Sequence, residues 1–111
     1  MFGFGFGSKT KKYKDIEVSE FKELMKQKDT VILDVRTQAE TSDGKIPNSQ
    51  LINIMSLDFK GKVSKLDKDK TYLVYCRSGA RSGKACKTMA KLGFDKLYNL
   101  SGGIIAWKNE N

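Results

Sequence analysis

Apolar and polar positions divide this chain into short apolar runs and longer segments with helical spacing. The runs are too short for helices and are rich in Val, Ile, Leu and Tyr, which is typical of strands covered on both faces of a parallel sheet. Strands that alternate with helices predict a mainly parallel α/β sheet of about five strands, flanked by helices. The predicted strands are residues 16–18, 31–35, 51–54, 72–75 and 96–100.

Three segments have the apolar spacing of helices. The first is predicted over residues 20 to about 28 with Ser19 as its N-cap, the second covers residues 81–92, and the third ends the chain. Between the third and fourth strands, we expect a short turn or helix at residues 55–60 and a polar surface crossover at residues 62–70. The apolar faces of the three helices consist of Phe21, Leu24 and Met25; of Ala85, Met89 and Leu92; and of Ile104, Ile105 and Trp107.

The composition of the chain limits the number of domains and the kinds of partner that we expect. With 111 residues and 39% apolar content, the chain suits one domain whose core needs no disulfide or metal. The excess of 21 basic over 13 acidic residues gives a net charge of +8, which favours anionic partners in general. No basic strand is interleaved with aromatics as an RNA-binding sheet requires, and no apolar run approaches the roughly 20 residues of a membrane helix. We therefore expect neither nucleic acid nor membrane as a partner.

The N-terminal segment differs from the rest. Residues 1–8 alternate Phe and Gly and are too short and uncharged for a signal peptide, so residues 1–14 are predicted to be a flexible tail and basic linker. Packing of the phenylalanines on a neighbour or second copy is the alternative. Residues 15–111 form the predicted domain. Two cysteines without a secretory pattern indicate a reducing compartment, by default the cytoplasm.

The candidate chemistry centres on Cys76, which follows the strand 72–75 and precedes the helix 81–92. A helix start and the cations of Arg77 and Arg81 favour a thiolate, the reactive form of cysteine. The chain has no histidine, which excludes Cys-His and Ser-His pairs and His-ligated metals. The loop amides are expected to point inward as an anion-binding nest. They belong to Arg77, Ser78, Gly79, Ala80 and Arg81.

Three motifs carry a family resemblance. C-R-S-G-A-R-S from Cys76 resembles the active-site loop of small single-domain members of the rhodanese-like (thiosulfate sulfurtransferase) family. V-I-L-D-V-R-T from Val31, followed by Glu40 and by G-K-I-P from Gly44, is similar to the first signature of that family. G-F-D-K-L-Y-N-L-S-G-G-I-I-A-W from Gly93 resembles its closing segment. The resemblance implies a rhodanese-like α/β domain.

The resemblance also implies an activity. Cys76 would take a sulfane sulfur from a small anionic donor, thiosulfate or a related compound, and hold it as a persulfide. The acceptor would be a thiol, cyanide or a cysteine of another protein, and no metal or organic cofactor is implied. The loop residues 77–81 are the expected substrate-binding group. We expect the Arg81 guanidinium to hold the donor's sulfonate through two oxygens, with Arg77 either sharing that role or facing water.

Charged residues follow the second predicted strand. Asp34, Arg36 and Glu40 are expected to hold the strand end, with direct substrate binding as the alternative, and their spacing permits a pair between Arg36 and Glu40. A carboxylate close to Cys76 would raise the pKa of its thiol, so these residues are not an acid/base pair. Asp34, Arg36 and Ser82 are the predicted surroundings of the site.

Two other functions remain open at this point. A phosphatase or arsenate reductase would use a similar loop, but those relatives enclose five residues between Cys and Arg, whereas Cys76 and Arg81 enclose four. A non-catalytic interaction module of the same fold is the second alternative. Cys86 is expected to be a small core residue, with a resolving thiol as its alternative.

Overall fold

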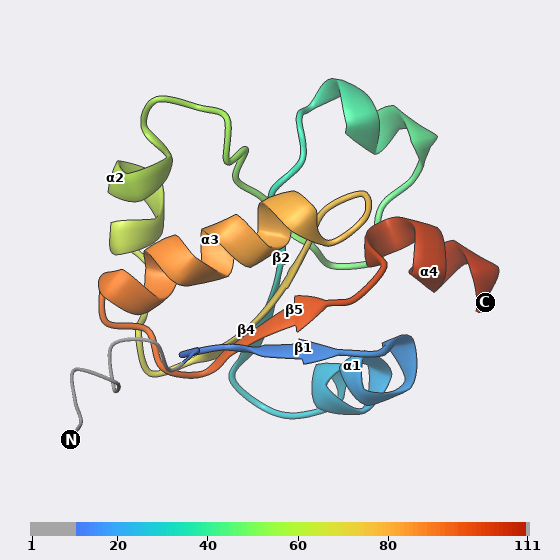
Figure 1. The fold of residues 1–111 in the computed structure, drawn as a ribbon, viewed down its shortest axis with the longest axis horizontal. Coiled ribbons are helices and arrows are strands. Elements are labelled where there is room, and N and C mark those ends of the chain that lie inside the picture. The colour runs from blue at the N-terminus through green and yellow to red at the C-terminus, as the bar shows by residue number, and fades with distance from the viewer. Residues whose placement is uncertain (1–10, 111) are drawn as a thin grey trace, which may run out of the picture.

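A five-stranded parallel sheet forms the centre of the computed structural model, which describes residues 11–110, and the strand order is β1-β5-β4-β2-β3 (Figure 1). Every neighbouring pair of strands is parallel, so the predicted α/β architecture is confirmed. The predicted tail at residues 1–8 lies outside the described residues. The strands are β1 (Lys14–Ile16), β2 (Thr30–Asp34), β3 (Gln50–Leu51), β4 (Thr71–Tyr75) and β5 (Leu97–Leu100).

Helices cover both faces of this sheet because β4 is apolar at successive positions, and successive side chains of a strand point to opposite faces. Tyr72 and Val74 pack with α2 and α3 in one buried cluster. Leu73 and Tyr75 pack with α1 and α4 in the other. The helices are α1 (Val18–Met25), α2 (Phe59–Ser64), α3 (Ala80–Lys91) and α4 (Gly103–Asn109), with a 3-10 helix η2 at Ala39–Asp43.

The register of the central strands positions the site. Asp34 of β2 lies opposite Tyr75 of β4, and Val74 of β4 lies opposite Asn99 of β5. The carboxyl ends of these three strands therefore lie side by side, and the loops that follow them leave the sheet at one edge. In open parallel sheets this is the edge where ligands bind.

The first helix differs from the prediction. It begins at Val18 rather than at residue 20, its N-cap is Glu17 rather than Ser19, and it ends at Met25 rather than near residue 28. The reason is tertiary, because Val18 is buried in the cluster beneath the sheet, and that burial outweighs the preference of serine for the cap. The strand predicted at residues 16–18 accordingly ends at Ile16.

The predicted surface crossover at residues 62–70 is wrong at its start, where residues 62–64 are helical and Val63 is buried. Helix α2 continues to Ser64, and Val63 is fully buried in the same cluster as Phe59. These two residues are four apart, so they form one narrow apolar stripe within a lysine-rich segment. The strand predicted at residues 51–54 is also shorter, because only Gln50–Leu51 forms β3.

Candidate active site

The Cys76 loop, defined here as residues 76–81, joins β4 to α3. Its sharpest point is Gly79, whose φ of 109° is a left-handed conformation that glycine adopts without strain. A Cβ atom there would lie 3.3 Å from the carbonyl oxygen of Leu100 and 3.4 Å from the amide of Gly102. This tight turn against the end of β5 directs the Gly79 amide back toward Cys76.

Three donors from the start of α3 surround the Cys76 sulfur. The Gly79 amide lies 3.1 Å from Sγ, and the amide and hydroxyl of Ser82 each lie 3.4 Å from it. Ser82 is itself fully buried. Of the predicted loop amides, that of Gly79 donates to the sulfur, and the Ser82 amide, one residue beyond the predicted loop, is a further donor.

The pKa of Cys76 reflects two opposing effects. Burial of the side chain raises the pKa, whereas hydrogen bonds from the Ser82 hydroxyl and from the amides of Ser82, Gly79 and Ser78 lower it. The hydrogen bonds outweigh the burial, and the pKa lies below that of an ordinary thiol. Donors at the helix start, rather than a histidine, therefore favour the reactive thiolate.

Arg81 is occupied by a carboxylate. Its Nη1 and Nη2 atoms lie 2.7 and 2.8 Å from the two carboxylate oxygens of Glu40. The hydrogen bonds from Arg81 and from Thr37 lower the pKa of Glu40 to about 2. The pair that the sequence permitted between the Glu40 carboxylate and Arg36 does not form, because Arg36 reaches only the main-chain oxygen of Glu40, at 3.3 Å.

Asp34 and Arg36 form a buried ion pair at the end of β2. The closest contact, from Arg36 Nη2 to Asp34 Oδ2, is 2.7 Å, and the two side chains are 3% and 1% exposed. The Tyr75 hydroxyl donates to Asp34 over 2.8 Å, and Arg36 donates to the carbonyl oxygen of Gly44 over 2.9 Å. These bonds fasten the segment between β2 and β3 to the sheet.

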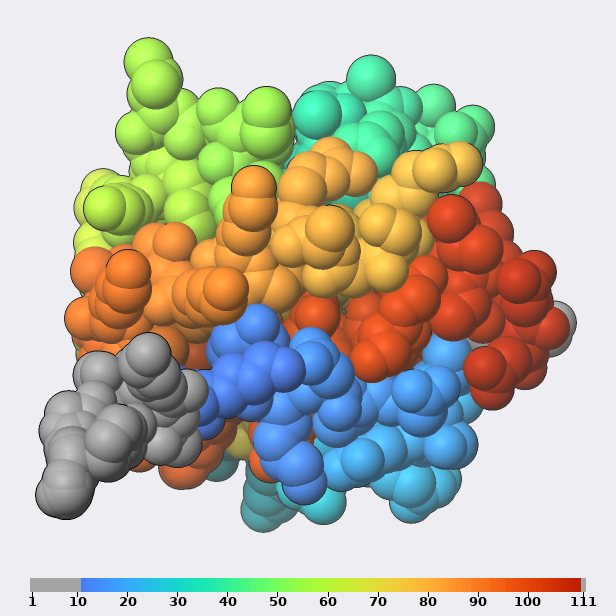
Figure 2. Space-filling view, viewed as in Figure 1, coloured from blue at the N-terminus to red at the C-terminus, as the bar shows by residue number. Residues whose placement is uncertain are grey.

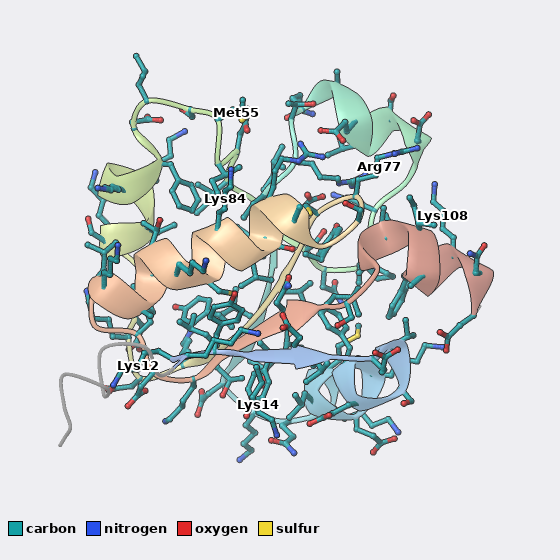
Figure 3. The ribbon with its side chains drawn as sticks, in the orientation of Figure 1. Lys12, Lys14, Met55, Arg77, Lys84 and Lys108 are labelled. Atoms are coloured by element: carbon teal, nitrogen blue, oxygen red, sulfur yellow. The ribbon has the colours of Figure 1, made fainter. Side chains whose placement is uncertain are left out.

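Arg77 has the opposite environment. Its side chain is exposed and lies between η2 and α4, beside Lys108 (Figure 3). Together with Glu40, Asp43 and Ile105 it lines a hollow of about 360 Å³. Figure 2 shows the start of α3 packed between the η2 segment and α4 on the viewed face. Within residues 11–110 no carboxylate forms an ion pair with Arg77, so an unpaired guanidinium lies at the rim of the Cys76 loop.

Two polar residues at the site were absent from the sequence prediction. Asn99 of β5 lies 2.5 Å from the Ser82 hydroxyl through its Oδ1 atom, and Asp15 of β1 accepts from the Asn99 side chain at 2.9 Å. A polar amide in the otherwise apolar strand 97–100 is the signal that could have indicated Asn99. Asp15 carries no such signal, because its role depends on which strand lies beside β5.

Cys86 lies in the core. It is fully buried between α3 and the sheet, and this burial raises the pKa of its thiol to about 12. Both cysteines are free thiols. Cys86 therefore has the environment of an inert core residue rather than that of a reactive thiol.

Residues 11–110 contain neither a metal-binding cluster nor a membrane-spanning helix. No group of three or more His, Cys, Asp or Glu side chains in that part of the chain is arranged to hold a metal ion. No helix within it is long and apolar enough to cross a bilayer.

Comparisons with known proteins agree with the observed fold. The family described as Rhodanese-like domain matches residues 17–110. The chain is 38% identical over 84 residues to a sulfurtransferase of Allochromatium vinosum, covering 76% of this chain and 77% of that protein. It is 36% identical over 96 residues to the thiosulfate sulfurtransferase GlpE of Coxiella burnetii, covering 86% and 88%. A rhodanese-related protein from Thermoplasma volcanium superposes with a TM-score of 0.77 at 35% identity, covering 89% and 94%.

Proposed function

Because the chain belongs to the rhodanese-like domain family, we propose that it is a sulfurtransferase that carries sulfane sulfur as a Cys76 persulfide. The observation that carries this proposal is the set of donors around the Cys76 sulfur. The Gly79 amide and the Ser82 amide and hydroxyl lie within 3.1 to 3.4 Å of Sγ. Such donors stabilise the negative charge of a thiolate or a persulfide, so no neighbouring base such as histidine is needed.

The proposed reaction has two displacement steps. In the first, the Cys76 thiolate attacks the outer sulfur of thiosulfate, the sulfur–sulfur bond of the donor breaks, and sulfite leaves with the electron pair. In the second, an acceptor thiolate or cyanide attacks the terminal sulfur of the persulfide, and Cys76 departs as a thiolate. Each step moves one neutral sulfur atom between nucleophiles, so no external oxidant or reductant is required.

The donor's sulfonate is expected to meet Arg77 first. Sequence reasoning assigned this role to Arg81, but both terminal nitrogens of Arg81 are occupied by the Glu40 carboxylate. Arg77 is exposed at the rim of the hollow beside the loop, where a guanidinium binds paired oxygens in two-point fashion. We therefore propose Arg77 as the donor-binding cation and Arg81 as the residue that holds the loop to η2.

Access to the sulfur requires local movement. Cys76 is fully buried, so a donor reaches Sγ only when side chains of the loop move aside. The side chains of Arg77 and Ser78 are exposed, so we place the opening on that side of the loop. The acceptor would use the same opening, since both steps take place at one sulfur atom.

Incubation with thiosulfate followed by mass spectrometry tests the proposal directly. The peptide containing Cys76 should gain roughly 32 Da, the mass of one sulfur atom. Addition of cyanide should remove that mass and release thiocyanate. The variant Cys76→Ser should lose both results, whereas Cys86→Ala, which alters the other free thiol, should retain them. If neither thiosulfate nor a low-molecular-weight persulfide loads Cys76, the proposed activity is wrong and an interaction module is the better interpretation.

A further inference from the structure

The Ser82 hydroxyl faces two partners with only one proton. Its Oγ atom lies 3.4 Å from the Cys76 sulfur and 2.5 Å from Oδ1 of Asn99. An amide oxygen accepts hydrogen bonds and cannot donate them, and a serine hydroxyl has a single hydrogen. Ser82 can therefore donate to Asn99 or to the sulfur, but not fully to both at once.

The orientation of Asn99 is fixed by its other end. Its Nδ2 atom donates to the Asp15 carboxylate over 2.9 Å and to the Gly79 carbonyl oxygen over 3.1 Å. Both partners are acceptors, so the amide nitrogen must face them and Oδ1 must face Ser82. Asp15 and Asn99 are direct partners in the register of β1 and β5, which places their side chains on one face. In Figure 2 β1 lies beside α3 on that face.

We propose that Asn99 is a positioning residue that controls the ionisation of Cys76 by competing with its sulfur for the Ser82 proton. Asp15 strengthens the competition from the edge strand, because a hydrogen bond from Nδ2 to a carboxylate increases the negative charge on Oδ1. The inference rests on the proposed role of Cys76 as the nucleophile.

The two states of the sulfur use the hydroxyl differently. While Cys76 is a thiol, Ser82 donates to Asn99 and presents a lone pair to the sulfur. When the loop opens and Cys76 ionises, its proton passes to solvent, and the Ser82 hydroxyl rotates toward the thiolate and keeps its own hydrogen. The bond to Asn99 is lost in that rotation, so Asn99 favours the thiol and opposes the thiolate. No covalent bond other than S–H changes.

Removal of the Asn99 side chain should release Ser82 without displacing Gly79. The Gly79 carbonyl oxygen also accepts from the Gly83 amide over 3.1 Å, and Gly79 packs against the backbone of Leu100 and Gly102. The Gly79 amide thus keeps its place at the sulfur. A lower thiol pKa would make Cys76 a better leaving group in the second step and a weaker nucleophile in the first.

Other charges near this network remain unchanged when Asn99→Leu is compared with the unaltered protein. They are Arg77 and Arg81 on the loop, Glu40 paired with Arg81, Asp34 paired with Arg36 at the end of β2, and Lys11 paired with Asp15.

A double-mutant cycle tests the competition. Asn99→Leu, of similar size, is made alone and together with Ser82→Ala, and the rate of alkylation by iodoacetamide is followed against pH. In the Ser82 protein the thiol pKa should fall by about one unit, the effect of a strengthened hydrogen bond to a charged group. In the Ser82→Ala background the same substitution should not lower the pKa. An equal change in both backgrounds, or a rise in both, would overturn the inference.

Asp15→Asn provides a second variant that does not depend on core packing, since the Asp15 side chain is 40% exposed. It should lower the thiol pKa by less than Asn99→Leu does, and only when Ser82 is present. The matched control is Asp95→Asn, which removes an exposed carboxylate that precedes β5 and should leave the pKa unchanged. An equal pKa shift from Asp95→Asn would show that the effect of Asp15→Asn comes from general surface charge. That result would refute the proposed effect of Asp15 through Asn99 and Ser82.

Alkylation requires no sulfur transfer, so the two proposals fail separately. A protein that shows this coupling but never forms a persulfide would refute only the sulfurtransferase activity. A protein that transfers sulfur without the coupling would refute only the role of Asn99.

Discussion

Arg81 and Glu40 form a two-point ion pair that joins the first turn of α3 to η2, across 41 positions of the chain. The two side chains are 28% and 29% exposed, so water screens the pair in part. Its position matters more than its strength, because it connects the helix whose N-terminus surrounds Cys76 to the segment that follows β2. Arg81 thereby supports the loop from outside.

The first prediction concerns acid stability. The pKa of Glu40 is lowered by Arg81 to about 2 in the folded protein, below the value of about 4.3 for an unfolded chain. A depressed carboxyl pKa stabilises the fold above the unfolded value, and this contribution is lost as pH falls from about 4.3 toward 2. Glu40→Gln should cost about 1 kcal/mol at pH 7, allowing for solvent screening, and much less near pH 2. Urea unfolding at the two pH values measures the difference.

A constant cost of Glu40→Gln across that pH range would show that the charge of Glu40 contributes nothing. Asp43→Asn, which alters another carboxylate of the same 3-10 helix, is the control and should show a smaller pH dependence.

The second prediction concerns the Cys76 thiol. Hydrogen bonds from Ser82 and from the loop amides outweigh burial, so its pKa lies below the ordinary value of about 8.5. The rate of iodoacetamide alkylation should therefore reach half its maximum below that pH. Ser82→Ala removes one donor and should move the midpoint upward. A midpoint at or above the ordinary value in the unaltered protein would contradict the stabilised thiolate.

The third prediction separates the two loop arginines. Arg77→Ala should raise KM for thiosulfate about tenfold or more with a smaller effect on kcat, because a charge-assisted contact to the donor is lost. Arg81→Ala should mainly lower stability, since its guanidinium bonds to Glu40. Lys84→Ala, an exposed cation on the outer side of α3, is the control and should change neither quantity. If instead Arg81→Ala raised KM and Arg77→Ala lowered stability, Arg81 would be the residue that binds the donor.

The fourth prediction uses two glycines. Gly79→Ala places a side chain at a φ of 109° and 3.3 Å from the Leu100 carbonyl oxygen, so it should cost about 1–3 kcal/mol and most of the activity. Gly61→Ala lies in helix α2 with nothing within 4 Å of the added Cβ. It should stabilise the protein by about 0.5–1 kcal/mol without affecting transfer. Thermal unfolding and a thiocyanate assay measure the stability and the activity of both variants. Equal stability and activity of the two variants would show that Gly79 has no special role in the loop.

The local pattern of apolar and polar residues determined most of the central secondary structure of this protein. The apolar runs placed β2, β4 and β5 within one residue of their observed bounds, and the helix predicted at residues 81–92 is Ala80–Lys91. The position of Cys76 between a buried strand and a helix start was equally clear from sequence. These features depend on residues a few positions apart, which is the range over which periodicity and turn preferences act.

Tertiary structure decided which side chains meet. Glu40 pairs with Arg81 rather than with Arg36, because the buried Asp34 carboxylate already binds the Arg36 guanidinium. The start of α1 and the burial of Val63 likewise followed from contacts with the sheet, not from local preference.

The connection from Asp15 through Asn99 to Ser82 and Cys76 was the feature least accessible from sequence. Asp15 and Asn99 are 84 positions apart and become neighbours only because β1 adds to β5 at the edge of the sheet in one register. Strand order and register are set by the simultaneous burial of two apolar faces, to which every helix and strand contributes. The sequence alone therefore determined the position of Cys76 and the elements around it, whereas the folded sheet decided which polar groups reach its sulfur.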